Sequence, residues 1–133
     1  MGHISRSMPI RDAREGDEIA VANLVDTSRD AVREMLRLRT VRVLETSGEV
    51  VGMVSFDATP EGVQVTRLAG PTERLSSLLE EPIRFGECEN LPIEMVVPTD
   101  ERENAAALRA AGFEEIGNGP GFRGTPTVVF RRE

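Results

Sequence analysis

Residues 63–75 read VQVTRLAGPTERL, an alternating apolar run that stops at a glycine and a proline. Val63 and Val65 alternate with polar residues, which is typical of a strand with one buried face. After the proline, Thr72 is well suited to be the N-cap of a helix, because its hydroxyl can accept from the first free backbone N–H groups. The stretch therefore predicts a strand over residues 63–69 that leads directly into a helix.

A second buried strand is predicted over residues 91–97, where Ile93, Met95, Val96 and Val97 gather. The intervening helix contains Pro82, which removes an N–H donor, so we expect that helix to kink or end near Glu81. A strand, a helix and a second strand joined in this way form a right-handed βαβ unit. The centre of the molecule is therefore predicted to hold two parallel strands.

The elements around this unit are read from the same periodicities. In chain order they are a strand at residues 10–13, a helix from Asp17, a helix over 31–38, a hairpin of strands 41–44 and 50–56 about Ser47-Gly48, a helix from Pro98 to a left-handed Gly112, a loop over 117–124 and a strand over 128–130. The order predicts an α/β (α+β) fold with a mixed, mostly antiparallel sheet flanked by helices.

Length and composition predict one domain. The chain has 133 residues, of which 39% are hydrophobic, and a single domain commonly spans about 100–150 residues. Residues 1–7 look unlike the rest and hold the only histidine, so we expect them to be a leader before a natural start at Met8, and the domain to cover residues 8–133.

The charge argues against two classes of partner. The formal net charge is −7, and every basic residue apart from the histidine is an arginine. Such a surface disfavours nucleic acid and anionic membranes, both of which bind clustered cations. Two explanations of the composition stay open: a halophile-like protein from a salty cytoplasm, or arginine codon bias in a GC-rich genome.

The lack of an apolar span, of a secretory signal and of a second cysteine supports expectations about localisation, disulfides and metal binding. It has no apolar stretch of about 20 residues and no secretory signal, which predicts a cytoplasmic protein. Cys88 is the only cysteine, so we expect no disulfide within the chain, no metal site, and a buried thiol rather than a nucleophile.

Two motifs make the order of elements more specific. Residues 96–98, Val-Val-Pro, lead into a helix that closes with AAGFEEIG at 110–117, and residues 10–13, IRDA, open the chain before its first helix. From Met8 onward this pattern resembles the GNAT acyltransferase superfamily. The resemblance implies transfer of an acetyl group from acetyl-CoA to a small-molecule or peptide amine, with a homodimer as a possible assembly.

The resemblance also implies where the cofactor lies, between the strands at residues 63–69 and 93–97. The pantetheine arm would pair with the strand edge in the manner of an added strand, and the pyrophosphate would meet the helix N-terminus. The implied cofactor-binding residues are Leu68, Ala69, Gly70, Thr72 and Arg74.

The sequence departs from the family pattern at two points. Residues 70–75 lack the glycine-rich phosphate loop, Pro71 lacks an N–H donor, and Glu73 adds an anion. The family's frequent tyrosine acid corresponds to Leu108, and the chain has no tyrosine. Two interpretations therefore stay open: a divergent N-acyltransferase, or a non-catalytic scaffold of the same fold that has lost cofactor binding.

Several side chains are candidates for the chemistry. We expect Glu94 to be the general base for the amine, with Glu87 as an alternative, unless Glu94 lies on a solvated strand edge. Arg67 is either a surface residue or a partner for an acidic substrate or cofactor. Glu101 and Asn104 are interpreted as capping and surface groups, and the loop over 117–124 as a substrate flap or a plain turn.

Overall fold

The computed structural model describes residues 10–121 and 123–133, so the predicted leader and Met8 lie outside the described residues. In chain order the elements are β1 (Ile10–Asp12), a 3-10 turn (Glu15–Asp17), α1 (Glu18–Leu24), α2 (Arg29–Leu38), β2 (Thr40–Thr46), β3 (Glu49–Thr59), β4 (Gly62–Ala69), a 3-10 turn (Thr72–Arg74), α3 (Leu75–Glu89), β5 (Ile93–Pro98), α4 (Arg102–Ala110), β6 (Glu114–Asn118) and β7 (Thr127–Arg132).

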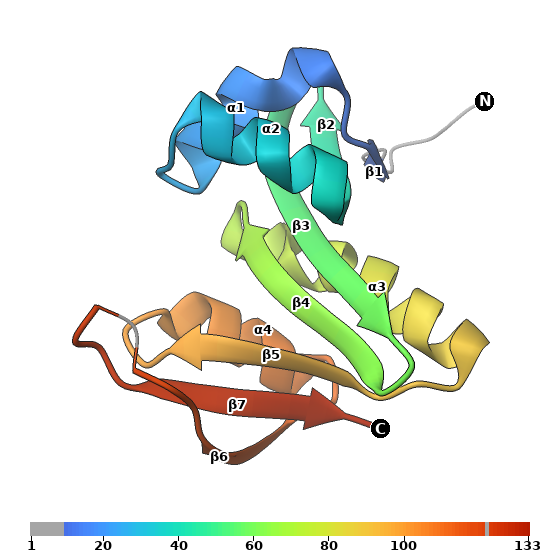
Figure 1. Ribbon diagram of the computed structural model, residues 1–133, viewed down its shortest axis with the longest axis vertical. Helices are drawn as coiled ribbons and strands as arrows, with labels where there is room; N and C mark the ends of the chain where they lie inside the picture. Colours follow the sequence, from blue (N-terminus) through green and yellow to red (C-terminus); the bar gives the residue numbers. More distant parts are fainter. Residues whose placement is uncertain (1–9, 122) are drawn as a thin grey trace.

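The strands of the described residues form one sheet in the order β1-β2-β3-β4-β5-β7-β6 (Figure 1). Neighbouring strands are antiparallel except β4 and β5, which are parallel and joined through α3. The last strand, β7, lies between β5 and β6. The predicted mixed, mostly antiparallel sheet with a central βαβ unit is confirmed.

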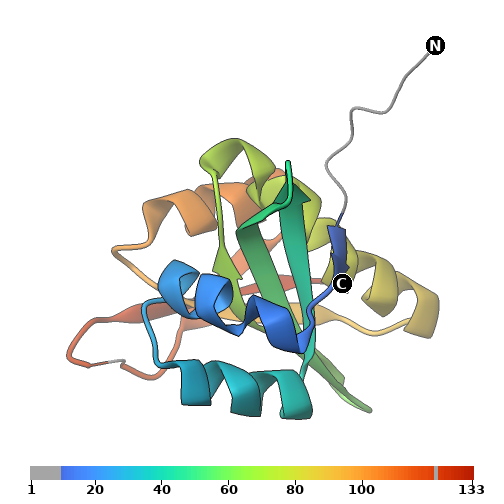
Figure 2. The same cartoon turned by 90° about the horizontal axis from the view of Figure 1, so that it is seen from above.

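Helices cover both faces of this sheet, with α1 and α2 on one face and α3 and α4 on the other (Figure 2). The α1–α2 side encloses a small core that includes Val21, Val32 and Met53. The opposite side encloses the larger core, in which Leu78 and Phe130 are buried. Because α1 and α2 sit over β2 and β3, they leave the same face of β5 and β7 uncovered (Figure 1).

The hairpin between β2 and β3 confirms the predicted turn. Thr46 pairs with Glu49, so Ser47 and Gly48 form a two-residue loop. Both loop residues have positive φ, 53° and 81°, which is the geometry that matches the twist of an antiparallel pair.

The prediction that Pro82 could end the third helix was wrong. Helix α3 continues through it to Glu89. Proline in a helix costs about 3 kcal/mol, but its ring here is buried on the same helix face as Leu78 and Leu79. Packing of that face against the sheet therefore holds the helix together across the missing hydrogen bond.

Strand β6 was missed by the sequence analysis. All of its residues are exposed, so it has no alternation between a buried and a wet face. It forms because its backbone pairs with β7, with a bulge at Ile116. The predicted loop over residues 117–124 therefore begins later, after Asn118.

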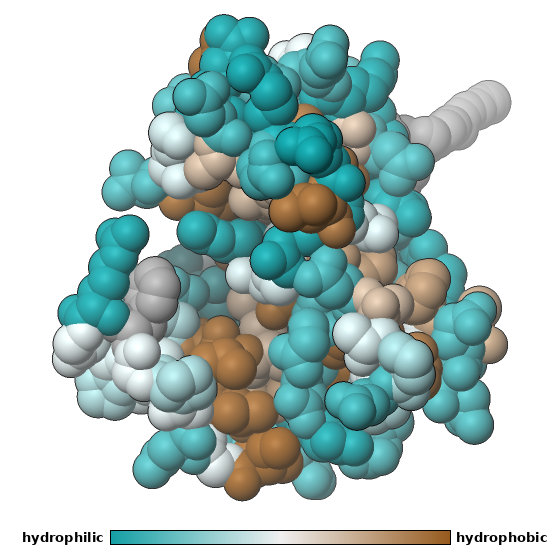
Figure 3. All heavy atoms as spheres, in the orientation of Figure 1, coloured by the Kyte–Doolittle hydropathy of each residue, from teal (hydrophilic) through white to brown (hydrophobic). Residues whose placement is uncertain are grey.

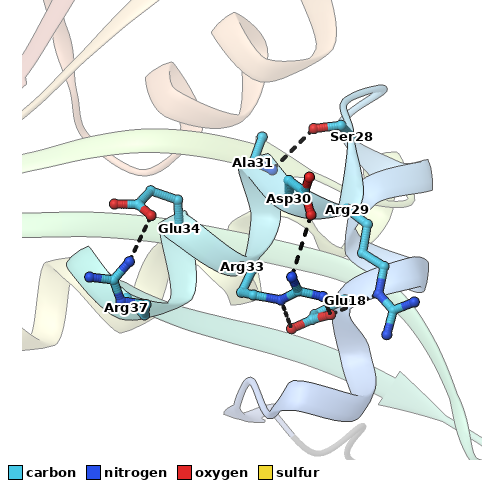
Figure 4. A network of polar contacts seen from close by, with 8 residues as sticks. All are labelled: Glu18, Ser28, Arg29, Asp30, Ala31, Arg33, Glu34 and Arg37. Carbon is cyan, nitrogen blue, oxygen red and sulfur yellow. Dashed lines mark hydrogen bonds and ion pairs between the residues drawn. The ribbon is translucent and has the colours of Figure 1, made fainter.

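Buried carboxylates hold α1 and α2 together and to β1. The Glu18 side chain, only 3% exposed, accepts from Arg29 at 2.9 Å and from Arg33 at 3.3 Å, both on α2 (Figure 4). These arginines, Arg29 first, lower the pKa of Glu18 below its ordinary value. The helix pair is thus fixed by charge as well as by its apolar face.

Asp17 lies at the N-cap position of α1 but makes no side-chain cap bond there. Its carboxylate instead accepts from the Arg11 guanidinium at 2.9 and 3.1 Å and from the Arg14 backbone N–H at 2.8 Å. Arg11 is the main cause of a lowered pKa at Asp17. This contact ties β1 to the start of α1.

Acid is expected to destabilise the protein through Asp17 and Glu18. Because folding lowers both pKa values, their contribution is complete above the unfolded values of about 4 and is lost as the pH falls through the lower folded values. Urea unfolding from pH 7 to pH 3 should show that loss. The Asp17→Asn variant should be less stable at pH 7 and less sensitive to acid, whereas the control Glu49→Gln, at an exposed hairpin position, should follow the wild type. Equal acid slopes for Asp17→Asn and the wild type would contradict this assignment.

Candidate functional site

The two parallel strands at the centre of the sheet separate partway along their length. Pairing of β4 with β5 ends at Val65 and Met95, although β4 continues to Ala69 and β5 to Pro98. At the same point the pairing of β4 with β3 skips Thr66, which makes a β-bulge. A bulge bends a strand and increases its twist, so it turns the end of β4 away from β5.

Two hydroxyl groups hold the bulge in place. The Thr66 and Ser55 side-chain oxygens lie 2.6 Å apart, and the Thr66 hydroxyl also donates to the Ser55 carbonyl at 3.1 Å. Ser55 is fully buried, so one partner of these contacts is fixed inside the sheet. Separation of the strands is therefore built into the sheet.

A cleft of about 470 Å³ opens where the strands separate. It lies between the α1–α2 loop and the β6–β7 loop, where the surface in Figure 3 is hollowed, and apolar surface gathers below it over β5 and β7. Its lining comes from Leu24, Val25, Asp26, Thr66, Arg67, Leu68, Ala69, Met95, Val96, Pro98, Glu101, Asn104, Pro120, Gly121 and Thr127.

Val96 forms part of the β5 wall of the cleft, and its side chain is exposed to solvent. The sequence predicts it to be buried with the rest of its strand, but it is 37% exposed. It points away from the core face of β5, which carries Met95, and no helix of the described residues covers that side. An apolar side chain is thus left facing the cleft.

Asn104 is a site residue that the sequence analysis interpreted as a surface group. From α4 its amide nitrogen donates to the Leu68 carbonyl on β4 at 3.1 Å and to the Glu101 carboxylate at 3.0 Å. The contact crosses the gap between the separated strands. The sequence offers no indication of it, because the two partners are 36 residues apart and meet only in the folded sheet.

The cofactor-binding residues predicted from the sequence divide into two groups. Leu68 and Ala69 line the cleft. Gly70, Thr72 and Arg74 are not part of its lining and lie in the turn just beyond it.

Residues 70–74 form the turn between β4 and α3. Gly70 has a φ of +153°, and a Cβ there would lie 3.1 Å from the Gly52 Cα, so this glycine is required for close packing. Thr72 is predicted to be a helix N-cap, but the structure places it inside a 3-10 turn instead. The N-cap residue of that turn is Pro71, which makes no side-chain cap bond. The Arg74 Nε is buried without an acceptor among the described residues.

Glu94, the predicted base, lies outside the cleft. It borders a separate hollow at the start of β5, where its carboxylate accepts from Arg131 at 2.8 Å and from Gln64 at 3.2 Å. Glu87 pairs with Arg132 at 3.2 Å. Because Glu94 lies outside the cleft, its role as a base stays a prediction that its placement does not support.

Leu108 is fully buried on α4, so the position that aligns with the family's tyrosine offers an apolar side chain and no proton donor. Cys88 is exposed, against the prediction of a buried thiol. Among residues 10–121 and 123–133, no group of three or more acidic, histidine or cysteine side chains is arranged to hold a metal ion. Over the same residues, no helix is long and apolar enough to cross a membrane.

Solved structures resemble this chain closely in fold and distantly in sequence. Ard1 from Thermoplasma volcanium aligns with a TM-score of 0.79 at 16% identity, over 96% of this chain and 97% of its own. The ribosomal-protein-alanine N-acetyltransferase from Brucella melitensis aligns at 0.76 with 20% identity, over 94% and 99%. A GNAT family acetyltransferase from Elizabethkingia anophelis with acetyl-CoA bound aligns at 0.75 with 12% identity, over 97% and 99%.

No family model matches the sequence, and no curated protein matches it. The structural likeness establishes the fold alone: the chain has the GNAT acetyltransferase fold, as its sequence motifs predicted.

Proposed function

We propose that this GNAT-fold chain holds acetyl-CoA in the cleft between β4 and β5 and transfers the acetyl group to an amine. The observation that carries the proposal is the separation of these strands beyond Val65 and Met95. Within the part of the chain that the structure describes, the end of β4 then has no strand partner on that side, beside a cleft of about 470 Å³. Cofactor and substrate pockets commonly have volumes of about 300–1,000 Å³.

The pantetheine arm fits the edge of β4. Leu68 and Ala69 line the cleft and offer backbone groups to an extended ligand, as a sheet edge does to an added strand. The Leu68 carbonyl already accepts from Asn104 but keeps a second lone pair. Asn104 would therefore position this carbonyl for the ligand rather than block it.

The diphosphate end would meet the start of α3. This 15-residue helix presents its positive end there, preceded by the turn Thr72–Arg74. The Arg74 Nε, buried without an acceptor among the described residues, suits a phosphate oxygen. Pro71 and Glu73 weaken this end, so most of the affinity would come from the cleft.

When bound, acetyl-CoA would supply the acetyl group: the amine nitrogen would bond to the thioester carbon as the carbon–sulfur bond breaks, and the proton lost by the amine would pass through water to the leaving CoA thiolate. The chain has no tyrosine, and Leu108, at the position that aligns with the family's tyrosine, is buried in the core and does not line the cleft. The residues of the cleft would therefore act by orienting both reactants and excluding water, which is a large part of catalysis in bimolecular reactions.

Acetyl-CoA is expected to raise the unfolding temperature. A ligand at 100 times its dissociation constant adds about 2.7 kcal/mol to stability, which is a shift of several degrees for a domain of this size. The measurement is a thermal unfolding titration with acetyl-CoA, with ADP as a control for binding through the adenine nucleotide without the pantetheine arm. It is run at low and at high salt, because an acidic chain can depend on salt for folding.

An absence of any shift at millimolar acetyl-CoA, in both salts and with a folded protein, would contradict the proposal. It would favour the alternative, a GNAT-fold scaffold that does not bind the cofactor.

A further inference from the structure

Arg67 differs from the other arginines that border the hollow beside α2 and the separate hollow at the start of β5. Arg39 pairs with Asp57 and Arg131 with Glu94. Arg67 has no carboxylate partner among the described residues, and its one hydrogen bond is a long contact of 3.5 Å to the Val25 carbonyl. It is exposed, so its guanidinium is available to a ligand.

Arg67 lies where the cleft meets the hollow beside α2. It lies on β4 directly after the bulge at Thr66, and these two residues line both the cleft and this hollow, which has a volume of about 380 Å³. The hollow also contains Met35 and Leu38, so apolar surface lies next to the cation. A ligand that extends from the cleft toward α2 would pass Arg67.

Two carboxylates in the cleft are also without an ion pair. Asp26 in the α1–α2 loop and Glu101 at the start of α4 both line it, and neither pairs with a cation within the described residues. In the hollow beside α2, by contrast, Glu34 is paired with Arg37. In the cleft and the hollow beside α2 together, the charged side chains without an ion pair within the described residues are therefore one cation, Arg67, and two anions, Asp26 and Glu101.

We propose that the acceptor is a small amine that also carries a carboxylate, as an α-amino acid does, and that Arg67 binds this carboxylate. The inference rests on the proposed acetyl transfer. A guanidinium binds a carboxylate through two parallel hydrogen bonds, which selects for the acid over an amide of the same shape. Asp26 and Glu101 would attract the ammonium group, and the apolar walls would take an aliphatic side chain.

A binding experiment tests this without the cofactor. N-acetyl-L-leucine, the product-like acid, and N-acetyl-L-leucinamide, its neutral match, are titrated into 15N-labelled protein. We expect the acid to shift the amide resonances of residues 66–69 and to bind about tenfold or more tighter than the amide, a preference that Arg67→Gln removes. Arg102→Gln, an exposed arginine outside the cleft, is the matched control and should keep it.

The activity experiment uses L-leucine and L-leucinamide as acceptors with saturating acetyl-CoA. Arg67→Gln should raise the KM for leucine about tenfold or more with little change in kcat, should leave the thermal shift with acetyl-CoA intact, and should be partly rescued by Arg67→Lys. Failure of the acetyl-CoA shift alone would reject the acetyl transfer, while the binding experiment still decides the role of Arg67. Equal binding of the acid and the amide, or an Arg67→Gln variant that keeps the preference, would overturn the proposal.

Discussion

The Val96→Trp variant is expected to lose acetyl-CoA binding by about a hundredfold or more, equivalent to about 2.7 kcal/mol. Val96 lines the cleft from β5, opposite the end of β4, and is 37% exposed on the face that no helix covers. An indole at this position would fill the space that the pantetheine arm needs. Because the side chain lies outside the core, stability without ligand should change little.

The matched control for this experiment is Ile116→Trp. Ile116 is 53% exposed on β6 and does not line the cleft, so the same bulk is added to the same sheet without blocking the site. Isothermal titration calorimetry with acetyl-CoA gives the affinities, and thermal unfolding without ligand checks the fold. A folded Val96→Trp protein with the affinity of the wild type would show that the cofactor lies elsewhere.

The Gly70→Ala variant is expected to lower the free energy of unfolding by about 2–4 kcal/mol. The φ of +153° is one that residues with a Cβ rarely adopt, and the new Cβ would lie 3.1 Å from the Gly52 Cα, a backbone atom that cannot easily move. Urea unfolding measures the loss.

Gly16→Ala is the control for this variant. Nothing lies within 4 Å of a Cβ at Gly16, so its stability should stay within about 0.5 kcal/mol of the wild type. If Gly70→Ala kept full stability and lost only acetyl-CoA binding, the glycine would serve the phosphate directly, as the sequence predicts, and its packing against β3 would be unimportant.

The absence of an acid and of a free base at the predicted positions has a consequence for the proposed chemistry. Glu94 is engaged by Arg131, and Leu108 replaces a hydroxyl with an apolar side chain. Deprotonation of the amine would then depend on water or on Glu101, the carboxylate that Asn104 holds in the cleft. Such a site gains most of its rate from orientation, so a slow enzyme with a well-defined acceptor is the expected outcome.

Local patterns in the sequence were sufficient for the order of the elements except β6, which has no buried face. Alternation predicted β4, the Ser47-Gly48 turn predicted the hairpin, and Gly112, with a φ of +91°, ends α4 as expected. Each of these features depends on neighbours a few residues away, which is the range over which backbone geometry and helix or strand periodicity act.

Which residues and contacts form the cleft was decided by the tertiary structure. Leu68 and Ala69, which the sequence predicts to bind the cofactor, line the cleft because they end the strand that borders it. The sequence did not reveal the bulge at Thr66 that opens the strands, the reach of Asn104 to β4, or the capture of Glu94 by Arg131. These contacts join residues far apart in the chain, and the register of the sheet brings them together.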